Sequence, residues 1–208
     1  KDILKYVQKA GIPTDKPIIT QVSRMDVWKD PEGLLDAFKL VKEEVDCRLV
    51  YCYDLASDDP EGNGVFQRTY RKARKLVESG DVIFVLGNSQ ILVNAIQRFS
   101  DVLLQKSIRE GFCLCVTEAM WKGKPVVATN VGGIPCQCQE AVNGYMVEPH
   151  DTKAFAEKIV QLLKNPDMAA EMGAKGKEIV REKFLITRLL QDYLELLNDM
   201  LWRSPDRK

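Results

Sequence analysis

Two glutamates, Glu110 and Glu118, stand with seven residues between them and could bind the hydroxyl groups of a sugar. Charged carboxylates accept strong hydrogen bonds from such donors. Glu110 follows the apolar run 101–105, which predicts a strand, and Glu118 lies within 115–122, which predicts a helix. The amides and dipole at the N-terminus of a helix suit a phosphate group. Together these features predict a site for a nucleotide-sugar.

Two cations upstream, Arg24 and Lys29, could complete that site. Transfer of a glycosyl group from a nucleotide-sugar leaves negative charge on the departing diphosphate, and fixed cations near that charge lower the barrier. Arginine offers a planar fork to phosphate oxygens, whereas lysine offers a mobile point charge. The alternative is a solvated basic pair in a loop, as most surface lysines and arginines are.

Strands and helices are predicted to alternate along the whole chain. Apolar residues at helical spacing mark the helices, and short continuous apolar runs mark the strands of a buried parallel sheet. Asp151 resembles a helix N-cap, and Asn165-Pro166 should end that helix. Alternation of this kind predicts an α/β fold with a doubly wound parallel sheet, in which ligands bind beyond the carboxyl ends of the strands. The predicted strands are 18–22, 48–53, 82–86, 101–105, 125–129 and 145–147, and the helices are 31–45, 65–79, 91–99, 115–122, a short one near 137, 151–163, 167–183 and 187–202.

The composition is that of an ordinary globular protein and argues against several classes of partner. A chain of 208 residues fits one domain. Lysine plus arginine equals aspartate plus glutamate at 30 each, so charge gives no case for binding nucleic acid or a membrane surface. No apolar run approaches the ~20 residues of a membrane span. The chain has neither an initiator methionine nor a signal peptide, so we expect a cytoplasmic piece of a longer protein.

The six cysteines are not expected to bind metal or to form disulfides. Cys113 with Cys115 and Cys136 with Cys138 form C-x-C pairs, whereas structural zinc sites usually have two to four residues between their cysteines. Disulfides are rare in chains of cytosolic type, so the cysteines are predicted to be small buried hydrophobes. The single histidine, His150, is predicted to be a solvated loop residue.

The stretch around the two glutamates resembles the E-x7-E motif of retaining glycosyltransferases with the GT-B fold, which has two Rossmann-like domains. More narrowly, it is similar to the trehalose glycosyltransferring synthases and trehalose phosphorylases of glycosyltransferase family four. The resemblance covers about residues 15–200. The matching segments are 94–95, 97–98, 100–102, 104–107, 109–112 and 117–121, with 22–24, 28–29 and 58–62 upstream.

The resemblance implies that residues 1–208 form one Rossmann-like, donor-binding domain with C-terminal helices at about 167–202, and that the N-terminal acceptor domain is absent. It implies an enzyme of carbohydrate metabolism that moves glucose from a nucleotide diphosphate glucose, of the ADP or UDP type, to glucose and so forms trehalose. No further cofactor is implied, a homodimer of the full-length enzyme stays open, and the isolated domain is expected not to turn over.

The resemblance also assigns roles to individual residues. Arg24, Lys29 and Glu110 would be catalytic, the two cations by holding the diphosphate and Glu110 by accepting from a donor-sugar hydroxyl. Glu118 would accept from the ribose hydroxyls; the alternative for it is a helix glutamate that complements the dipole. Further contacts to the nucleotide-sugar would come from the end of the third strand at Gly87 and from Gly111, Phe112, Cys113 and Leu114, the last three through backbone amides.

Two substitutions near the predicted site depart from the family pattern. Cys113 and Tyr53 stand where the family has glycine, and a tyrosine ring could fill space meant for the diphosphate. Two alternative functions therefore stay open. One is a trehalose phosphorylase-like domain, in which phosphate replaces the nucleotide, and the other is a non-catalytic Rossmann-like scaffold that has lost its ligand.

Overall fold

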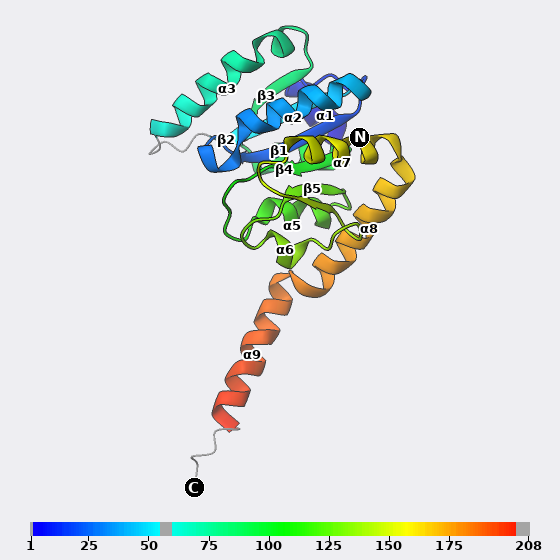
Figure 1. Ribbon diagram of the computed structural model, residues 1–208. Helices are drawn as coiled ribbons and strands as arrows, with labels where there is room; N and C mark the ends of the chain where they lie inside the picture. Colours follow the sequence, from blue (N-terminus) through cyan, green and yellow to red (C-terminus); the bar gives the residue numbers. More distant parts are fainter. Residues whose placement is uncertain (1, 55–59, 203–208) are drawn as a thin grey trace.

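The computed structural model describes residues 2–54 and 60–202. Within these residues, six strands form one parallel sheet in the order β3-β2-β1-β4-β5-β6 (Figure 1). Asp58 and Asp59 of the predicted motif lie outside the described residues. The strands are β1 (Ile18–Arg24), β2 (Arg48–Asp54), β3 (Val82–Leu86), β4 (Val102–Gln105), β5 (Val126–Thr129) and β6 (Tyr145–Val147).

The strand order reverses between β1 and β4. β1 pairs with β2 on one side and with β4 on the other, and all pairings are parallel. The connections that follow β1 and β4 therefore run in opposite directions and leave an opening at the carboxyl ends of these two strands. The predicted doubly wound α/β fold is confirmed, and every predicted strand is present.

Helices cover both faces of the sheet (Figure 1). On one face α2 (Pro31–Glu44), α3 (Pro60–Glu78) and α7 (Thr152–Lys164) bury residues such as Leu34, Phe38 and Phe155 against the strands. The other face is covered by helices whose apolar residues form two further clusters. They are α1 (Asp2–Lys9), α4 (Gln90–Phe99) and α5 (Leu114–Trp121). The remaining elements are η1 (Val27–Lys29), α6 (Ile134–Gln137), α8 (Pro166–Lys183) and α9 (Ile186–Trp202).

Some element boundaries differ from the predicted ones. β1 continues to Arg24, because it follows β2 residue by residue up to the Arg24–Asp54 pair. α3 begins at Pro60 rather than 65, since proline suits the first turn of a helix even where Gly62 and Gly64 follow. The predicted cap of α7 is confirmed, because the Asp151 carboxylate accepts from the Ala154 amide at 2.8 Å.

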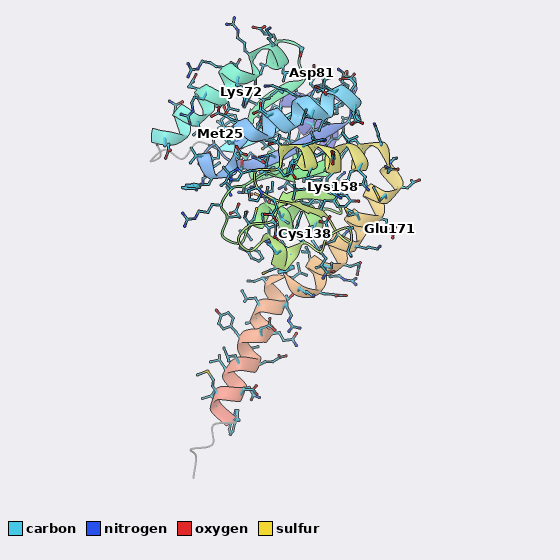
Figure 2. All side chains as sticks on the ribbon, in the orientation of Figure 1. Met25, Lys72, Asp81, Cys138, Lys158 and Glu171 are labelled. Atoms are coloured by element: carbon cyan, nitrogen blue, oxygen red, sulfur yellow. The ribbon has the colours of Figure 1, made fainter. Side chains whose placement is uncertain are left out.

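Helix α9 projects away from the body of the molecule (Figure 1). Its side chains stand in the open along its whole length (Figure 2). The apolar ones include Leu190, Leu194 and Leu197, each more than half exposed. The helix therefore contributes little to the packing around the sheet.

The cysteines are free thiols, and four of them are buried as predicted. Cys115 is half-buried and Cys136 is exposed, so the prediction of burial is wrong for Cys136. His150 is exposed. Across residues 2–54 and 60–202, no group of three or more histidine, cysteine, aspartate or glutamate side chains is placed to hold a metal ion. None of the helices described has the length and apolar character that crossing a membrane requires.

Candidate functional site

The Lys29–Glu110 ion pair stands at the carboxyl ends of β1 and β4. Lys29 ends η1, the short helix after β1, and Glu110 lies in the connection from β4 to α5. The Lys29 ammonium donates to the Glu110 carboxylate, and the two side chains are 16% and 11% exposed. Ser107 donates a second hydrogen bond to Glu110 at 3.2 Å. The predicted proximity of these two groups is therefore present, and they contact each other directly.

The electrostatics of Glu110 favour its charged form. Burial by itself would raise the pKa of this carboxyl, but hydrogen bonds and charge outweigh it and hold the pKa below 4.5. The hydrogen bond and positive charge of Lys29 contribute most to this lowering, followed by the Cys113 thiol and the Gly111 amide. Glu110 is therefore an acceptor-only group at neutral pH, as a partner for sugar hydroxyls must be.

Arg24 lies beside this pair but is far more open to solvent. Its guanidinium contacts the Asp26 carboxylate at 3.2 Å, and its side chain is 60% exposed. Asp26 also caps η1 by accepting from the Lys29 amide at 3.1 Å. A hollow of about 310 Å³ gathers these groups. Its lining is Arg24, Asp26, Trp28, Lys29, Arg109, Glu110 and Gly111.

Glu118 lies in a second hollow, of about 320 Å³, between α4 and α5. Its carboxylate accepts from the Gln97 amide at 2.9 Å. Gln97 is buried, and its own side-chain oxygen has no partner among the described residues. The two glutamates thus belong to different hollows rather than to one. The second is lined by Gln90, Val93, Asn94, Gln97, Arg98, Glu118, Trp121 and Lys122.

Cys115 stands in the first turn of α5, between Glu110 and Glu118 in the sequence. Burial raises the pKa of its thiol to about 11, and the charges of Glu118, Lys29 and Glu110 all act on it. α5 follows Glu110 in the chain and carries Glu118, so its first turn joins the loop of the first hollow to the helix that lines the second.

Backbone amides at the start of α5 are free of hydrogen bonds within the described residues, but their residues line neither hollow. The amides of Phe112, Cys113 and Leu114 donate to no other group in the described part of the chain. Cys113 is the N-cap and has the left-handed conformation, with φ at 71°, which favours glycine. The family pattern of glycine at this position therefore has a backbone reason. The Leu114 side chain is exposed, whereas the Phe112 ring contacts Phe184 with centroids 5.7 Å apart.

The loop after β5 presses against the connection that carries Glu110. Gly132 has φ at 55°, and a Cβ atom there would overlap the Glu110 carbonyl. A Cβ atom on Gly133 would lie 2.9 Å from the Gly111 carbonyl, which accepts from the Gly133 amide at 2.6 Å. The Gly-Gly pair therefore allows close backbone contact that holds Glu110 in place.

Tyr53 does not enter either hollow. Its ring stacks on Phe66 of α3 with centroids 5.0 Å apart and meets Phe84 edge-on at 6.2 Å. The ring thus packs under α3. Gly87 follows β3, and its amide donates to the Tyr53 carbonyl at 2.7 Å, but it lines neither hollow. The predicted role of Gly87 in binding the nucleotide-sugar stays a prediction.

Sequence reasoning missed the groups that support the site. They are Gln21, Asp26 and Asp30, besides Gln97, Lys106 and Ser107, which counted only as matches to the family. The signal available was a polar residue within an apolar run: Gln21 interrupts β1 and Gln105 ends β4, and both are buried. Buried polar groups need partners, so such residues point to a hydrogen-bonded network.

The comparisons with known proteins identify the family and the fold of this chain. The family of group 1 glycosyl transferases matches residues 2–179. Trehalose synthase from Pyrococcus horikoshii is 44% identical over 200 residues, which make up 96% of this chain and 48% of the relative. This chain therefore spans about half the length of that curated relative.

Solved structures show the same fold. A glycosyltransferase from Rickettsia africae superposes with a TM-score of 0.84 at 26% identity, over 98% of this chain and 52% of that one. HepE from Anabaena, solved in complex with UDP-glucose, superposes with a TM-score of 0.81 at 23% identity, over 95% of this chain and 52% of that one. The E-x7-E spacing, the doubly wound sheet and the family match agree, and this chain belongs to the group 1 glycosyl transferases.

Proposed function

We propose that this chain is the donor-binding domain of a retaining glycosyltransferase that moves glucose from a nucleotide diphosphate glucose to glucose, forming trehalose. The Lys29–Glu110 pair in its hollow at the strand-order reversal carries the proposal. It offers one cation for phosphate and one carboxylate for a sugar hydroxyl side by side. The 44% identity to a trehalose synthase supports the choice of sugar transfer.

Each group has a chemical task in this proposal. A diphosphate competes with Glu110 for the Lys29 ammonium, and Arg24 reaches the outer oxygens from the exposed rim. The displaced Glu110 accepts from a hydroxyl of the donor glucose. As the glycosyl bond breaks, the charge that develops on the diphosphate is met by Lys29 and by the open amides at the start of α5.

The nucleoside end of the donor reaches the second hollow. Glu118 accepts from the ribose hydroxyls there, and Gln97 holds the carboxylate in position. The first turn of α5, around Cys115, spans the distance between ribose and diphosphate. The acceptor glucose binds on a further domain that closes over this edge of the sheet and excludes water.

Titration calorimetry with UDP, ADP and inorganic phosphate tests the proposal. We expect a nucleotide diphosphate to bind the 208-residue chain and Glu118→Gln to weaken it, because the ribose loses its charged acceptor. Lys164→Met serves as the control, since Lys164 pairs with Glu44 in an exposed contact. Binding of phosphate but neither nucleotide would instead favour the phosphorylase-like function.

A turnover assay tests the domain assignment. The chain alone, incubated with glucose and ADP-glucose or UDP-glucose, should form no trehalose, because the acceptor-binding half is needed to position the second sugar. Trehalose formation at an appreciable rate by the chain alone would contradict this part of the proposal. Failure of both nucleotides and phosphate to raise the melting temperature at millimolar concentration would favour the scaffold instead.

A further inference from the structure

We propose that Lys106 is a positioning residue whose buried ion pair with Asp30 holds Lys29 against Glu110. The inference rests on the proposed function, since the Lys29–Glu110 pair is the part of the site assigned to the diphosphate. Lys106 itself follows β4 and touches neither hollow, so it acts only through other residues.

Lys106 is the most deeply buried lysine among the described residues. Its side chain is 2% exposed, and its ammonium donates to the Asp30 carboxylate and to the Pro149 carbonyl, the latter at 3.1 Å. A buried ammonium group is costly unless it is paired and hydrogen-bonded. Both conditions are met here, so the ammonium has a fixed place between the connections that follow β1, β4 and β6.

Asp30 connects the fixed ammonium group of Lys106 to the backbone next to Lys29. It follows Lys29 directly and joins η1 to α2 in the left-handed conformation, with φ at 43°. Its second carboxylate oxygen accepts from the Gly33 amide at 3.0 Å, and its own amide donates to the Val27 carbonyl at 3.3 Å. The ion pair with Lys106 therefore fixes the residue at which η1 ends and α2 begins.

Gln21 ties the same two connections together a second time. Its side-chain amide donates to the Lys29 carbonyl at 3.0 Å, and its side-chain oxygen accepts from the Lys106 amide at 2.9 Å. Trp28 adds a backbone bond, in which its carbonyl accepts from the Ile108 amide at 2.7 Å. These bonds do not need the Lys106 side chain, so a substitution there should loosen the arrangement without unfolding the sheet.

An ion pair is a poor choice if stability is the only requirement. Apolar side chains of similar volume often stabilise a buried position as well as a salt bridge does, or better. A charged pair instead imposes direction, because the ammonium must meet both the Asp30 carboxylate and the Pro149 carbonyl. Because these two contacts fix Asp30, the residue after Lys29, they also keep the Lys29 ammonium within reach of a phosphate.

The test compares Lys106→Met with Arg48→Met in the full 208-residue chain. Arg48 is a matched control: its side chain is 6% exposed and pairs with Asp15, but at the opposite end of the sheet. Both variants should lose stability. At a temperature where both are folded, we expect Lys106→Met to weaken UDP binding about tenfold or more and Arg48→Met to leave it within about twofold.

A second readout follows the Glu110 carboxyl directly. In protein labelled with ¹³C-glutamate, with Glu110→Gln to assign the signal, its acid titration reports on the Lys29 contact. In Lys106→Met the Glu110 pKa should move upward from its lowered value, since Lys29 no longer stays beside it. Arg48→Met should leave the titration unchanged, and a merely structural role of Lys106 would do the same.

Each result supports or overturns the inference. Equal UDP affinity in Lys106→Met and the unsubstituted chain, with an unchanged Glu110 titration, overturns it. If neither UDP nor ADP binds the unsubstituted chain, the proposed function is wrong, and the Glu110 titration alone then decides the positioning; if only ADP binds, ADP replaces UDP in the comparison. If Lys106→Met does not fold, Asp30→Asn carries the same test, because asparagine tolerates the left-handed conformation and can still cap Gly33.

Discussion

The two edges of the sheet use charged side chains in opposite ways. At the amino edge, Lys16 and Lys42 each contact both Asp46 and Asp81, at 2.5 to 3.3 Å. Two cations and two anions thus satisfy one another in a closed network. The carboxylates of this network have lowered pKa values, and that of Asp46 is held at about 2 by its hydrogen bonds to Lys42 and Lys16.

At the carboxyl edge, the charged side chains can still make further hydrogen bonds and ion contacts. Lys29 contacts Glu110 as its one carboxylate partner within the described residues, and Arg24 stays largely exposed beside Asp26. The amides at the start of α5 add further donors. A phosphate group could therefore be accommodated here without breaking a closed network.

Helix dipoles explain why cations have different effects on stability at the two edges of the sheet. In a doubly wound parallel sheet, helices start at the carboxyl edge, so that edge carries their positive ends and the amino edge their negative ends. Cations such as Lys42 at the amino edge offset the dipoles and stabilise the fold. Arg24 and Lys29 lie where the dipoles are already positive, so their placement is less favourable there than that of Lys42, although Asp26 and Glu110 partly offset it. The carboxyl edge, where cations contribute less to stability, is therefore the edge expected to bind the nucleotide-sugar.

The largest expected contrast comes from two glycines. Gly132→Ala at the carboxyl edge should cost about 3 kcal/mol or more of unfolding free energy, because a left-handed residue is strained and its Cβ would overlap the Glu110 carbonyl. Gly80→Ala at the amino edge should cost about 1 kcal/mol, since Gly80 has φ at 75° but open space around it. Urea unfolding measures both. Equal losses would mean that the Gly132 loop yields easily and does not hold Glu110.

Two lysines sharpen the comparison for binding. Lys29→Met should weaken UDP binding about tenfold or more, because the phosphate loses its nearest fixed cation. Lys42→Met is the matched control, since its side chain is 20% exposed, close to the 16% of Lys29, and it too lies beside carboxylates. Calorimetry should find its UDP affinity unchanged. Similar weakening in both variants would show that general charge, rather than this edge, attracts the nucleotide.

The smallest expected effect is a pH dependence of stability at Glu110. Its folded-state pKa lies below 4.5, so its stabilising contribution is fully present above that value and is lost as the pH falls through the lowered pKa. Glu110→Gln should therefore cost about 1 kcal/mol near neutral pH and less in acid. Unfolding curves at several pH values below 7 measure the difference. A cost that does not shrink in acid would argue against a charged pair with Lys29.

The fold could be predicted from the sequence because its signals are local. Apolar runs such as 82–86 and helical spacing such as that of Leu34, Leu35 and Phe38 determine element type without knowledge of distant partners. Boundaries were less certain. Pairing with β2 extended β1 by two residues, so there a tertiary contact overrode local preference. The start of α3 at Pro60 instead follows from a local rule that the prediction did not apply, because proline suits the first turn of a helix.

The site could be predicted only in part. The proximity of Lys29 and Glu110 could be predicted, because both were expected at one ligand site beyond the strand ends, but their direct ion pair was not. The sequence did not predict that Glu118 lies in a different hollow from Glu110, because the orientation of α5 depends on the left-handed conformation of Cys113 at its start. The Lys106–Asp30 pair was also out of reach, since its partners lie 76 residues apart and a lysine is solvated by default.

Amide chemical shifts of the ¹⁵N-labelled chain, followed while UDP is added, test the central claim most directly. If the carboxyl edge is the donor site, the largest changes should fall on Lys29 and on Phe112, Cys113 and Leu114, while Gly80 and Asp81 at the amino edge should not move. Changes concentrated at the amino edge, or no changes with either UDP or ADP at millimolar concentration, would contradict the account.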